Sequence, residues 1–259
     1  MFDRKLYAAR RQRFSEEAGK VNFLHLEVED GLIETLSHIS KRFEKVWLYG
    51  QFYKFDPYDY GAIAVEKYDI LPMTANSDIV SCLDEEELAM PIRPTYDLVI
   101  SHMSAHLIND LPGLLLKYRR MLNPGGLFIA TLYGEHTLHE LRQAMMQVDM
   151  ELLGGAAPRV IPFVDVRTAG SLLQRAGFAM PVASYDRYQS LYRDIWEMFF
   201  DIRANAQANC LYARTSAPLN RLYLQRLEEV YKSKFALQEG IVCTYDVLTL
   251  SGSVDTKER

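Results

Sequence analysis

The hydrophobic pattern divides the chain into helical and extended segments. Over residues 23–43 the apolar residues recur three or four positions apart, which predicts an amphipathic helix with one buried stripe. From residue 45 the pattern changes to short continuous apolar runs. The runs at 45–50 and 96–101 are typical of strands that are buried on both faces. Helical spacing returns over 110–122 and 135–153, so strands and helices alternate along the chain.

The alternation continues to the end of the sequence and predicts the fold class. Strands are expected at 45–50, 61–65, 78–81, 96–101, 127–133, 182–188 and 241–251. Helices are expected at 3–18, 23–43, 110–122, 135–153, 165–176, 194–207 and 218–235. Asn123–Gly126 is a strong turn signal, and Gly177 is a typical residue to follow the end of a helix. We therefore expect an α/β fold with a doubly wound, mostly parallel seven-stranded sheet.

The predicted elements also indicate how the chain is organised. A helical N-terminal arm over residues 1–44 precedes an α/β domain over residues 45–259, which carries a helical insertion at about 189–238. The sequence contains no internal repeat and no low-complexity linker. One large domain is consistent with the length of 259 residues.

Charge and cysteine content exclude several classes of protein. The net charge is −5, which argues against a protein whose main role is to bind nucleic acid. The three cysteines lie far apart, so a disulfide framework is not expected and a reducing compartment fits best. No apolar run approaches the ~18–20 residues that cross a bilayer. Residues 1–13 are basic but no apolar signal core follows them, which favours the cytoplasm, with the mitochondrial matrix as the alternative.

In a parallel α/β sheet, ligands bind beyond the carboxyl ends of the strands. This rule selects four places in the sequence: the loop after Leu48, Glu66 after the second expected strand, Asp84 after the third, and the segment from Ser101 to Asp110 after the fourth. Ser101 begins that last segment. These places are the candidates for a binding or catalytic site.

Several segments resemble one family. They are Tyr96–Ser101, Ser104–Pro112, Leu122–Phe128, Thr137–Arg142, Pro158–Phe163 and Leu173–Phe178. Together they resemble the class I S-adenosylmethionine (SAM) dependent methyltransferases. The branch is that of the mitochondrial complex I assembly factors described as protein arginine hydroxylases, with their α-proteobacterial relatives, and it neighbours the malonyl-acyl-carrier-protein methyltransferases of biotin synthesis. The resemblance implies the Rossmann-like fold, SAM as cofactor, and a protein substrate or partner.

The resemblance also implies roles at the cofactor site. Gly50 stands where the family's glycine-rich loop begins, and Ser101, at the end of the fourth expected strand, is a further candidate for binding the cofactor. Glu66 matches the acid that bonds the ribose hydroxyls, with a solvated charge at a strand end as the alternative. Asp84 matches the acid that faces the adenine, with the acidic first turn of a helix as the alternative.

The loop after Gly50 departs from the family pattern. The family has several glycines there because the backbone must approach SAM closely. In this chain Gln51, Phe52 and Tyr53 follow Gly50. Either the loop is rebuilt and SAM still binds, or aromatic side chains fill the cavity and the protein is no longer an enzyme.

His106 is the catalytic candidate. It follows the fourth strand, where a neutral imidazole can orient a substrate or accept a proton. The alternative is a histidine that bonds neighbouring backbone. His102 with His106, and His136 with His139, raise the question of a metal. Because His102 and His106 flank a loop and no cysteine joins them, we expect no metal site.

Two functions follow from the sequence. The first is a SAM-dependent-methyltransferase-like protein that modifies a protein partner, or assists its assembly, with a subunit of respiratory complex I as the partner. The second is a non-catalytic relative that keeps the fold and acts as an assembly or interaction factor. The sequence leaves the oligomeric state open.

Overall fold

The computed structural model describes residues 1–13, 23–70, 80–205, 207–215, 219–237 and 239–256. The chain folds into two compact units, each described by itself. The sheet unit comprises Gly19–Gly134, Val164–Asp186 and Val247–Arg259. The helical unit comprises Met1–Ala18, Glu135–Phe163 and Arg187–Asp246. This grouping differs from the expected boundary after residue 44, because the helix before that boundary belongs to the sheet unit.

In the described residues the first four strands follow one another with only short 3-10 helices between them, and α-helices separate most of the later strands. The strands are β1 (Lys45–Tyr49), β2 (Ala64–Asp69), β3 (Val80–Cys82), β4 (Tyr96–His102), β5 (Leu122–Tyr133), β6 (Ala179–Tyr192), β7 (Ala236–Leu237) and β8 (Gly240–Ser253). The α-helices are α1 (Arg4–Arg13), α3 (Phe23–Ser37), α4 (Leu111–Met121), α5 (His139–Leu153), α6 (Val166–Ala176), α7 (Ile195–Ala204) and α8 (Arg221–Phe235). Three short 3-10 helices are η1 (Pro57–Tyr60), η2 (Glu85–Glu87) and η3 (Ala105–Leu107).

The strands pair in the order β3-β2-β1-β4-β5-β8-β6, and the two-residue β7 pairs with β8 outside this path. The pairs β1–β2, β1–β4, β2–β3 and β4–β5 are parallel. Strand β8 runs antiparallel to β5. The order reverses between β1 and β4, so the predicted doubly wound, mostly parallel sheet is confirmed.

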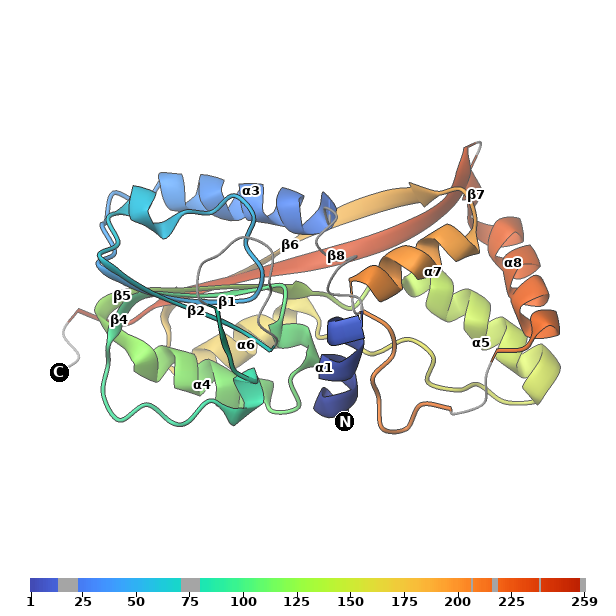
Figure 1. Ribbon diagram of the computed structural model, residues 1–259, viewed down its shortest axis with the longest axis horizontal. Coiled ribbons are helices and arrows are strands. Elements are labelled where there is room, and N and C mark those ends of the chain that lie inside the picture. The colour runs from blue at the N-terminus through green and yellow to red at the C-terminus, as the bar shows by residue number, and fades with distance from the viewer. Residues whose placement is uncertain (14–22, 71–79, 206, 216–218, 238, 257–259) are drawn as a thin grey trace. The chain divides into compact units, whose positions relative to one another are not determined.

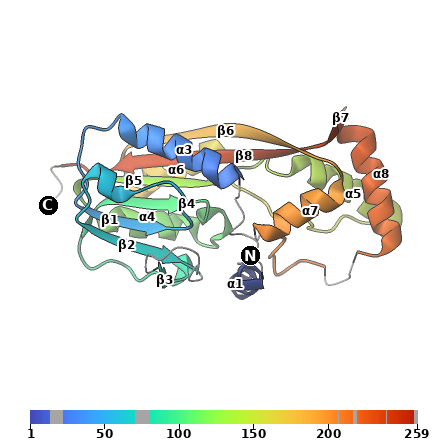
Figure 2. The same cartoon turned by 45° about the horizontal axis from the view of Figure 1, so that its top comes forward.

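Alternating side chains of the central strands pack against helices on both faces of the sheet. In β1, Val46 and Leu48 contact the cluster that includes Leu32 and Leu36 of α3. The intervening Trp47 lies in the opposite cluster with residues of α4 and α6. Figures 1 and 2 show α3 on one face and α4 and α6 on the other. This two-sided burial explains why the strands read as continuous apolar runs.

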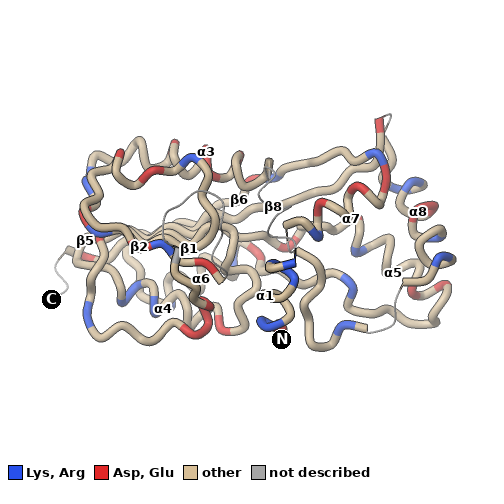
Figure 3. Tube along the Cα trace, viewed as in Figure 1, with Lys and Arg blue, Asp and Glu red and all other residues tan. Residues whose placement is uncertain are grey.

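The helical unit contains α1, α5, α7 and α8. An ion pair supports its interior: the guanidinium of Arg159 lies 2.8 Å from a carboxylate oxygen of Asp149 on α5. The hydroxyl of Tyr223 on α8 donates to the same carboxylate at 2.8 Å, which ties α8 to α5. Basic side chains gather on α1, drawn largely blue in Figure 3. Among the helices that the structure describes, none is long and apolar enough to cross a membrane.

Some predicted element boundaries are confirmed and others are wrong. The helix expected over 23–43 ends at Ser37, and the strand expected over 182–188 spans Ala179–Tyr192. Helix α6 begins after Asp165, whose side chain accepts from the N–H of Thr168, and ends at Gly177 with φ of +85°. The second strand was expected at 61–65 but β2 is Ala64–Asp69. The reason is that Gly61, with φ of +86°, ends η1, where its N–H caps the last turn.

The Asn123–Gly126 signal lies inside the assigned bounds of β5. The pairing with β4 nevertheless jumps from Leu122 to Leu127, so the four turn residues stay outside the ladder. Residues 14–18 of the first expected helix, 78–79 of the third expected strand and Pro218 at the start of the last expected helix lie outside the described residues.

Candidate functional site

The carboxyl ends of β1 and β4 meet at Gly50 and His102. Gly50 has φ of +102°, and a Cβ atom on it would lie 2.3 Å from the carbonyl oxygen of His102. Its N–H donates to the carbonyl of Tyr68 on β2 at 2.9 Å. A side chain at position 50 would therefore collide with the neighbouring strand end. Glycine is required at position 50 by the fold of the chain itself, as well as by the close ligand contact that the sequence pattern implied.

His102 ends β4 and is 1% exposed. The ring of Phe52 stacks on it with centroids 5.1 Å apart, and His25 meets its ring edge-on at 5.6 Å. Its Nδ1 lies 2.9 Å from the hydroxyl of Thr131. Burial lowers the pKa of His102 to about 4, against a weaker opposing effect of the His25 backbone. The ring is therefore neutral at neutral pH and is packed as part of the interior.

The loop after Gly50 is held by a carboxylate of the chain itself. Glu29 of α3 is 0% exposed. Its carboxylate accepts the N–H groups of Tyr53 at 2.9 Å, Lys54 at 2.8 Å and Phe55 at 2.6 Å. Three successive N–H groups around one carboxylate form an anion-binding concavity of the kind that binds phosphate in other proteins. In this protein the anion comes from Glu29.

Ser101 takes part in a buried hydrogen-bond network. Its hydroxyl donates to the carboxylate of Glu85 at 2.7 Å, and Ser104 donates to the same group. The hydroxyl of Tyr118 on α4 is a third donor to Glu85. Burial, and next the charge of Glu85, raise the pKa of Tyr118 well above its ordinary value. The hydroxyl of Ser101, itself 0% exposed, thus faces an internal partner.

Asp84 and Asp69 lie at the ends of β3 and β2. The side chain of Asp84 accepts the N–H of Glu86 at 3.1 Å and so caps η2, as its acidic-turn interpretation predicted. Asp69 is the last residue of β2 and is 2% exposed. Asp69 was not among the predicted site residues, because the second strand was expected to end at residue 65, four residues too early. The signal was present as an acid directly before the buried Ile70.

Glu66 does not lie at the end of a strand, so this part of the prediction is wrong. It is the third residue of β2, exposed, and pairs in register with Trp47. The hydroxyl of Tyr68 donates to its carboxylate at 2.7 Å. Burial, with this hydrogen bond second, raises the pKa of Tyr68 to about 12. The strand-end acid of β2 is Asp69, and a cofactor role for Glu66 stays a prediction.

His106 lies in η3 and is 5% exposed. Its ring meets the ring of Tyr133 edge-on at 4.7 Å. The pair His136 and His139 belongs to the helical unit. In the part of the chain that the structure describes, no three His, Cys, Asp or Glu residues form a group that could hold a metal ion. A catalytic role for His106 stays a prediction.

As arranged, the residues at this edge do not fit SAM. The loop donors that would meet an anionic group are bonded to Glu29. The space beside the end of β4 holds the stacked rings of Phe52 and His102. The hydroxyl of Ser101 is bonded to Glu85. We therefore derive no chemical step through this cofactor.

Solved structures define the class of fold. The YcgJ protein of Bacillus subtilis superposes with a TM-score of 0.53 at 10% identity, covering 87% of this chain and 97% of that protein. Phosphoethanolamine N-methyltransferase 2 of Haemonchus contortus, solved with SAM, superposes with a TM-score of 0.50 at 16% identity. The match covers 88% of this chain and 52% of that protein. Likeness at this identity shows the fold alone. The fold is the Rossmann-like fold of class I methyltransferases.

The sequence comparison identifies the family. The profile of the Methyltransferase domain family matches residues 3–181, and the chain belongs to this family. It is 35% identical over 184 residues to "Arginine-hydroxylase NDUFAF5, mitochondrial" of Danio rerio, which covers 68% of this chain and 56% of that protein. The human protein of the same name is 34% identical, covering 67% of this chain and 50% of the relative.

A second group of relatives has a different activity in its name. "Malonyl-[acyl-carrier protein] O-methyltransferase" of Xylella fastidiosa is 34% identical over 162 residues, covering 62% of this chain and 53% of that protein. The chain thus spans about half the length of the curated relatives that it matches. The expected resemblance to both groups is confirmed.

Proposed function

We propose that this chain is a methyltransferase-fold assembly factor that binds a protein partner and does not turn over SAM. The partner we propose is a subunit of respiratory complex I. The sequence motifs resemble the branch of the family that contains the complex I assembly factors. The identity to the mitochondrial arginine-hydroxylases supports this assignment. The compartment is the bacterial cytoplasm or the mitochondrial matrix.

One observation carries the non-catalytic part of the proposal. Side chains of the protein itself occupy the carboxyl ends of β1 and β4, with Phe52 against His102 and Glu29 in the concavity of the loop. Binding SAM there requires moving a buried carboxylate away from three donors. Such a rearrangement carries a large free-energy cost, because an unpaired buried charge is strongly unfavourable.

A second candidate is an enzyme that uses SAM to methylate or hydroxylate the partner. Asp69 favours it, since this buried acid stands at the end of β2, where the family places its ribose-binding acid. Gly50 also favours it, because the first position of the glycine loop is kept. In this case Glu29 would have to leave the loop when the cofactor arrives.

The two candidates are separated by measuring binding and modification on the same partner. Recombinant soluble subunits of complex I are tested one by one against the immobilised full chain, with and without millimolar SAM. The proposal predicts that one subunit binds with an affinity that SAM does not change, and that its mass stays the same after incubation.

The YcgJ protein is the control bait, because it has the same fold. Binding of the same subunit to this control would assign the interaction to the fold in general and contradict the proposal. A mass increase of one methyl or hydroxyl group on the partner would establish the enzyme instead. Failure of every subunit to bind would exclude the proposed partner.

A further inference from the structure

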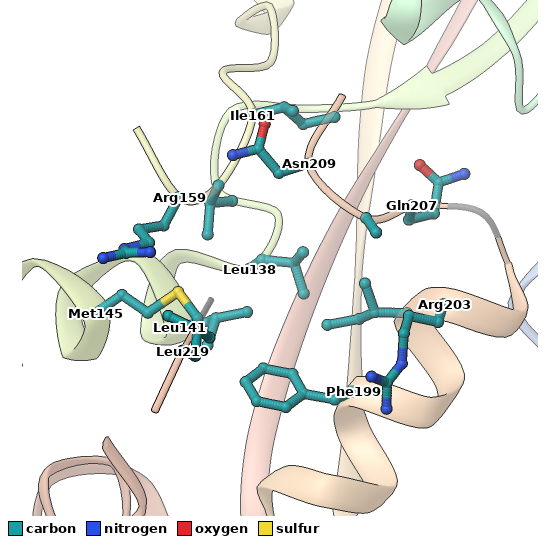
Figure 4. A pocket seen from close by; sticks show the side chains of 13 residues that line it. Leu138, Leu141, Met145, Arg159, Ile161, Phe199, Arg203, Gln207, Asn209 and Leu219 are labelled. Atoms are coloured by element: carbon teal, nitrogen blue, oxygen red, sulfur yellow. The ribbon is translucent and has the colours of Figure 1, made fainter. Parts of the chain in front are cut away.

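The helical unit contains a pocket that the proposed function does not use. Its volume is about 230 Å³. Side chains from α5, the segment after it, α7 and the segment before α8 line it, and Figure 4 shows Leu138 among them. Most of its wall is apolar, with Leu141, Ile161 and Phe199 among the lining residues. A cavity of about 150 Å³ accommodates one benzene ring, so this pocket has room for one ring or a chain of roughly six to eight carbons.

Two arginines line the pocket. The charge of Arg159 is neutralised by a carboxylate of the chain, whereas that of Arg203 is not neutralised by any residue that the structure describes. Arg159 donates to both carboxylate oxygens of Asp149 and lies 4.9 Å above the ring of Tyr223. Burial alone would raise the pKa of Asp149, but the hydrogen bonds from Arg159, Ala157 and Tyr223 hold it below its ordinary value. The pair therefore stays ionised and neutral overall.

Arg203 on α7 is exposed, and among the described residues it forms no ion pair. Figure 4 places it beside Phe199, on the opposite side of the pocket from Arg159. Gln207 and Asn209, the other polar residues of the wall, are uncharged. The pocket therefore combines an apolar interior with one uncompensated positive charge, a combination that favours an amphipathic anion.

The backbone of one residue that lines the pocket is strained. Leu138 has φ of +56° and ψ of +29°, a left-handed conformation that is unfavourable for leucine. Its N–H donates to the carbonyl of Thr244 at 2.8 Å, which holds this conformation in place. Its side chain is 4% exposed and lies on the pocket wall. Strain of this kind concentrates at binding sites, where the surrounding structure holds it in place.

We propose that this pocket binds a free small carboxylate with a hydrocarbon group of one ring or about six to eight carbons. The hydrocarbon lies against Leu138, Leu141 and Phe199, and the carboxylate pairs with Arg203. This site is lined by residues of the helical unit alone and goes beyond the proposed assembly function.

The test uses octanoate as the probe, titrated calorimetrically into the full chain, with octanol as the uncharged comparison. Octanoate is expected to bind more tightly than octanol. Arg203→Gln is expected to weaken octanoate about tenfold and to leave octanol unchanged, as for a charge-assisted hydrogen bond at a partly exposed site. Arg221→Gln, which removes an exposed arginine outside the pocket, is the charge control.

A second pair of variants tests the location. Ala208 lines the pocket and is half-buried, so Ala208→Phe fills the space without disturbing a helix. It is expected to abolish binding, whereas Ala213→Phe at an exposed turn is expected to bind like the wild type. Unchanged binding by a folded Ala208→Phe would overturn the location. Equal affinity for octanoate and octanol would overturn the role of Arg203, and no binding of octanoate at millimolar concentration would overturn the proposal.

Discussion

At the scale of single residues, the carboxyl edge depends on buried charges that several donors stabilise. Glu29 accepts three successive backbone N–H groups, and Glu85 accepts three hydroxyls. A buried carboxylate is stable only when hydrogen bonds replace its lost hydration. The sequence could not predict the role of Glu29, because its partners lie 24–26 residues away. On the sequence alone it is one acid beside the apolar stripe of a helix.

Replacing Glu29 with Gln tests this arrangement. The amide keeps one acceptor oxygen but loses the charge, so the three loop donors lose part of their stabilisation. We expect the free energy of unfolding in urea to fall by about 1–3 kcal/mol. Glu34→Gln, an exposed change on the same helix, is the control and should stay within about 0.5 kcal/mol of the wild type. Equal values for both variants would contradict the structure at this loop.

The buried ring of His102 predicts a dependence of stability on pH. Its pKa is about 4 in the folded protein, below the ordinary value of 6.5. Between these values the unfolded chain binds more protons, so stability falls as the pH falls through the window. From pH 7 to pH 5 this residue is expected to remove about 2 kcal/mol.

Urea denaturation at both pH values measures this effect. His102→Gln is expected to be less stable at pH 7, because the stacking with Phe52 is lost, but to have a flatter pH dependence. His38→Gln at an exposed position should keep the wild-type slope. The same slope in His102→Gln and the wild type would show that this ring does not titrate as described.

At the scale of elements, sequence reasoning succeeded where local chemistry determines a boundary. The Gly177 terminus of α6 is confirmed, and the start expected at Asp165 is right to within one residue, since Asp165 caps the helix. The second strand was misplaced because Gly61 resembles the start of a strand and instead ends η1. That error also hid Asp69, the acid at the true strand end. Strand β2 reads Ala-Val-Glu-Lys-Tyr-Asp, and its charged residues give a weak hydrophobic signal, which explains the error.

Replacing glycine with alanine is expected to have opposite effects on stability at two positions, one within α6 and one directly after it. Gly177 has φ of +85°, and an added Cβ would lie 3.1 Å from Arg119, so Gly177→Ala is expected to cost about 1–2 kcal/mol. Gly170 lies within the helix, where a Cβ would make ordinary contact with Ala183 at 3.5 Å. Gly170→Ala is therefore expected to stabilise by about 0.5–1 kcal/mol. Thermal unfolding of both variants tests the pair, and equal signs would contradict it.

At the scale of the whole molecule, the alternation of strands and helices predicted the architecture. The observed strand order follows from short crossovers between buried parallel strands, which few topologies satisfy. The family followed from motifs between Tyr96 and Phe178 and is confirmed. The sequence did not predict which side chains occupy the cofactor site at the strand ends. This occupancy depends on contacts among α3, the β1 loop and β4, and the sequence alone left both a rebuilt and a filled loop open.

In this protein the chain's own side chains occupy the carboxyl ends of β1 and β4. Titrating SAM into the purified full chain by isothermal titration calorimetry tests this claim. Since Glu29 and Phe52 occupy the loop and the strand end, we predict no heat of binding up to millimolar SAM. Micromolar binding would contradict the claim, because SAM would then displace these side chains readily.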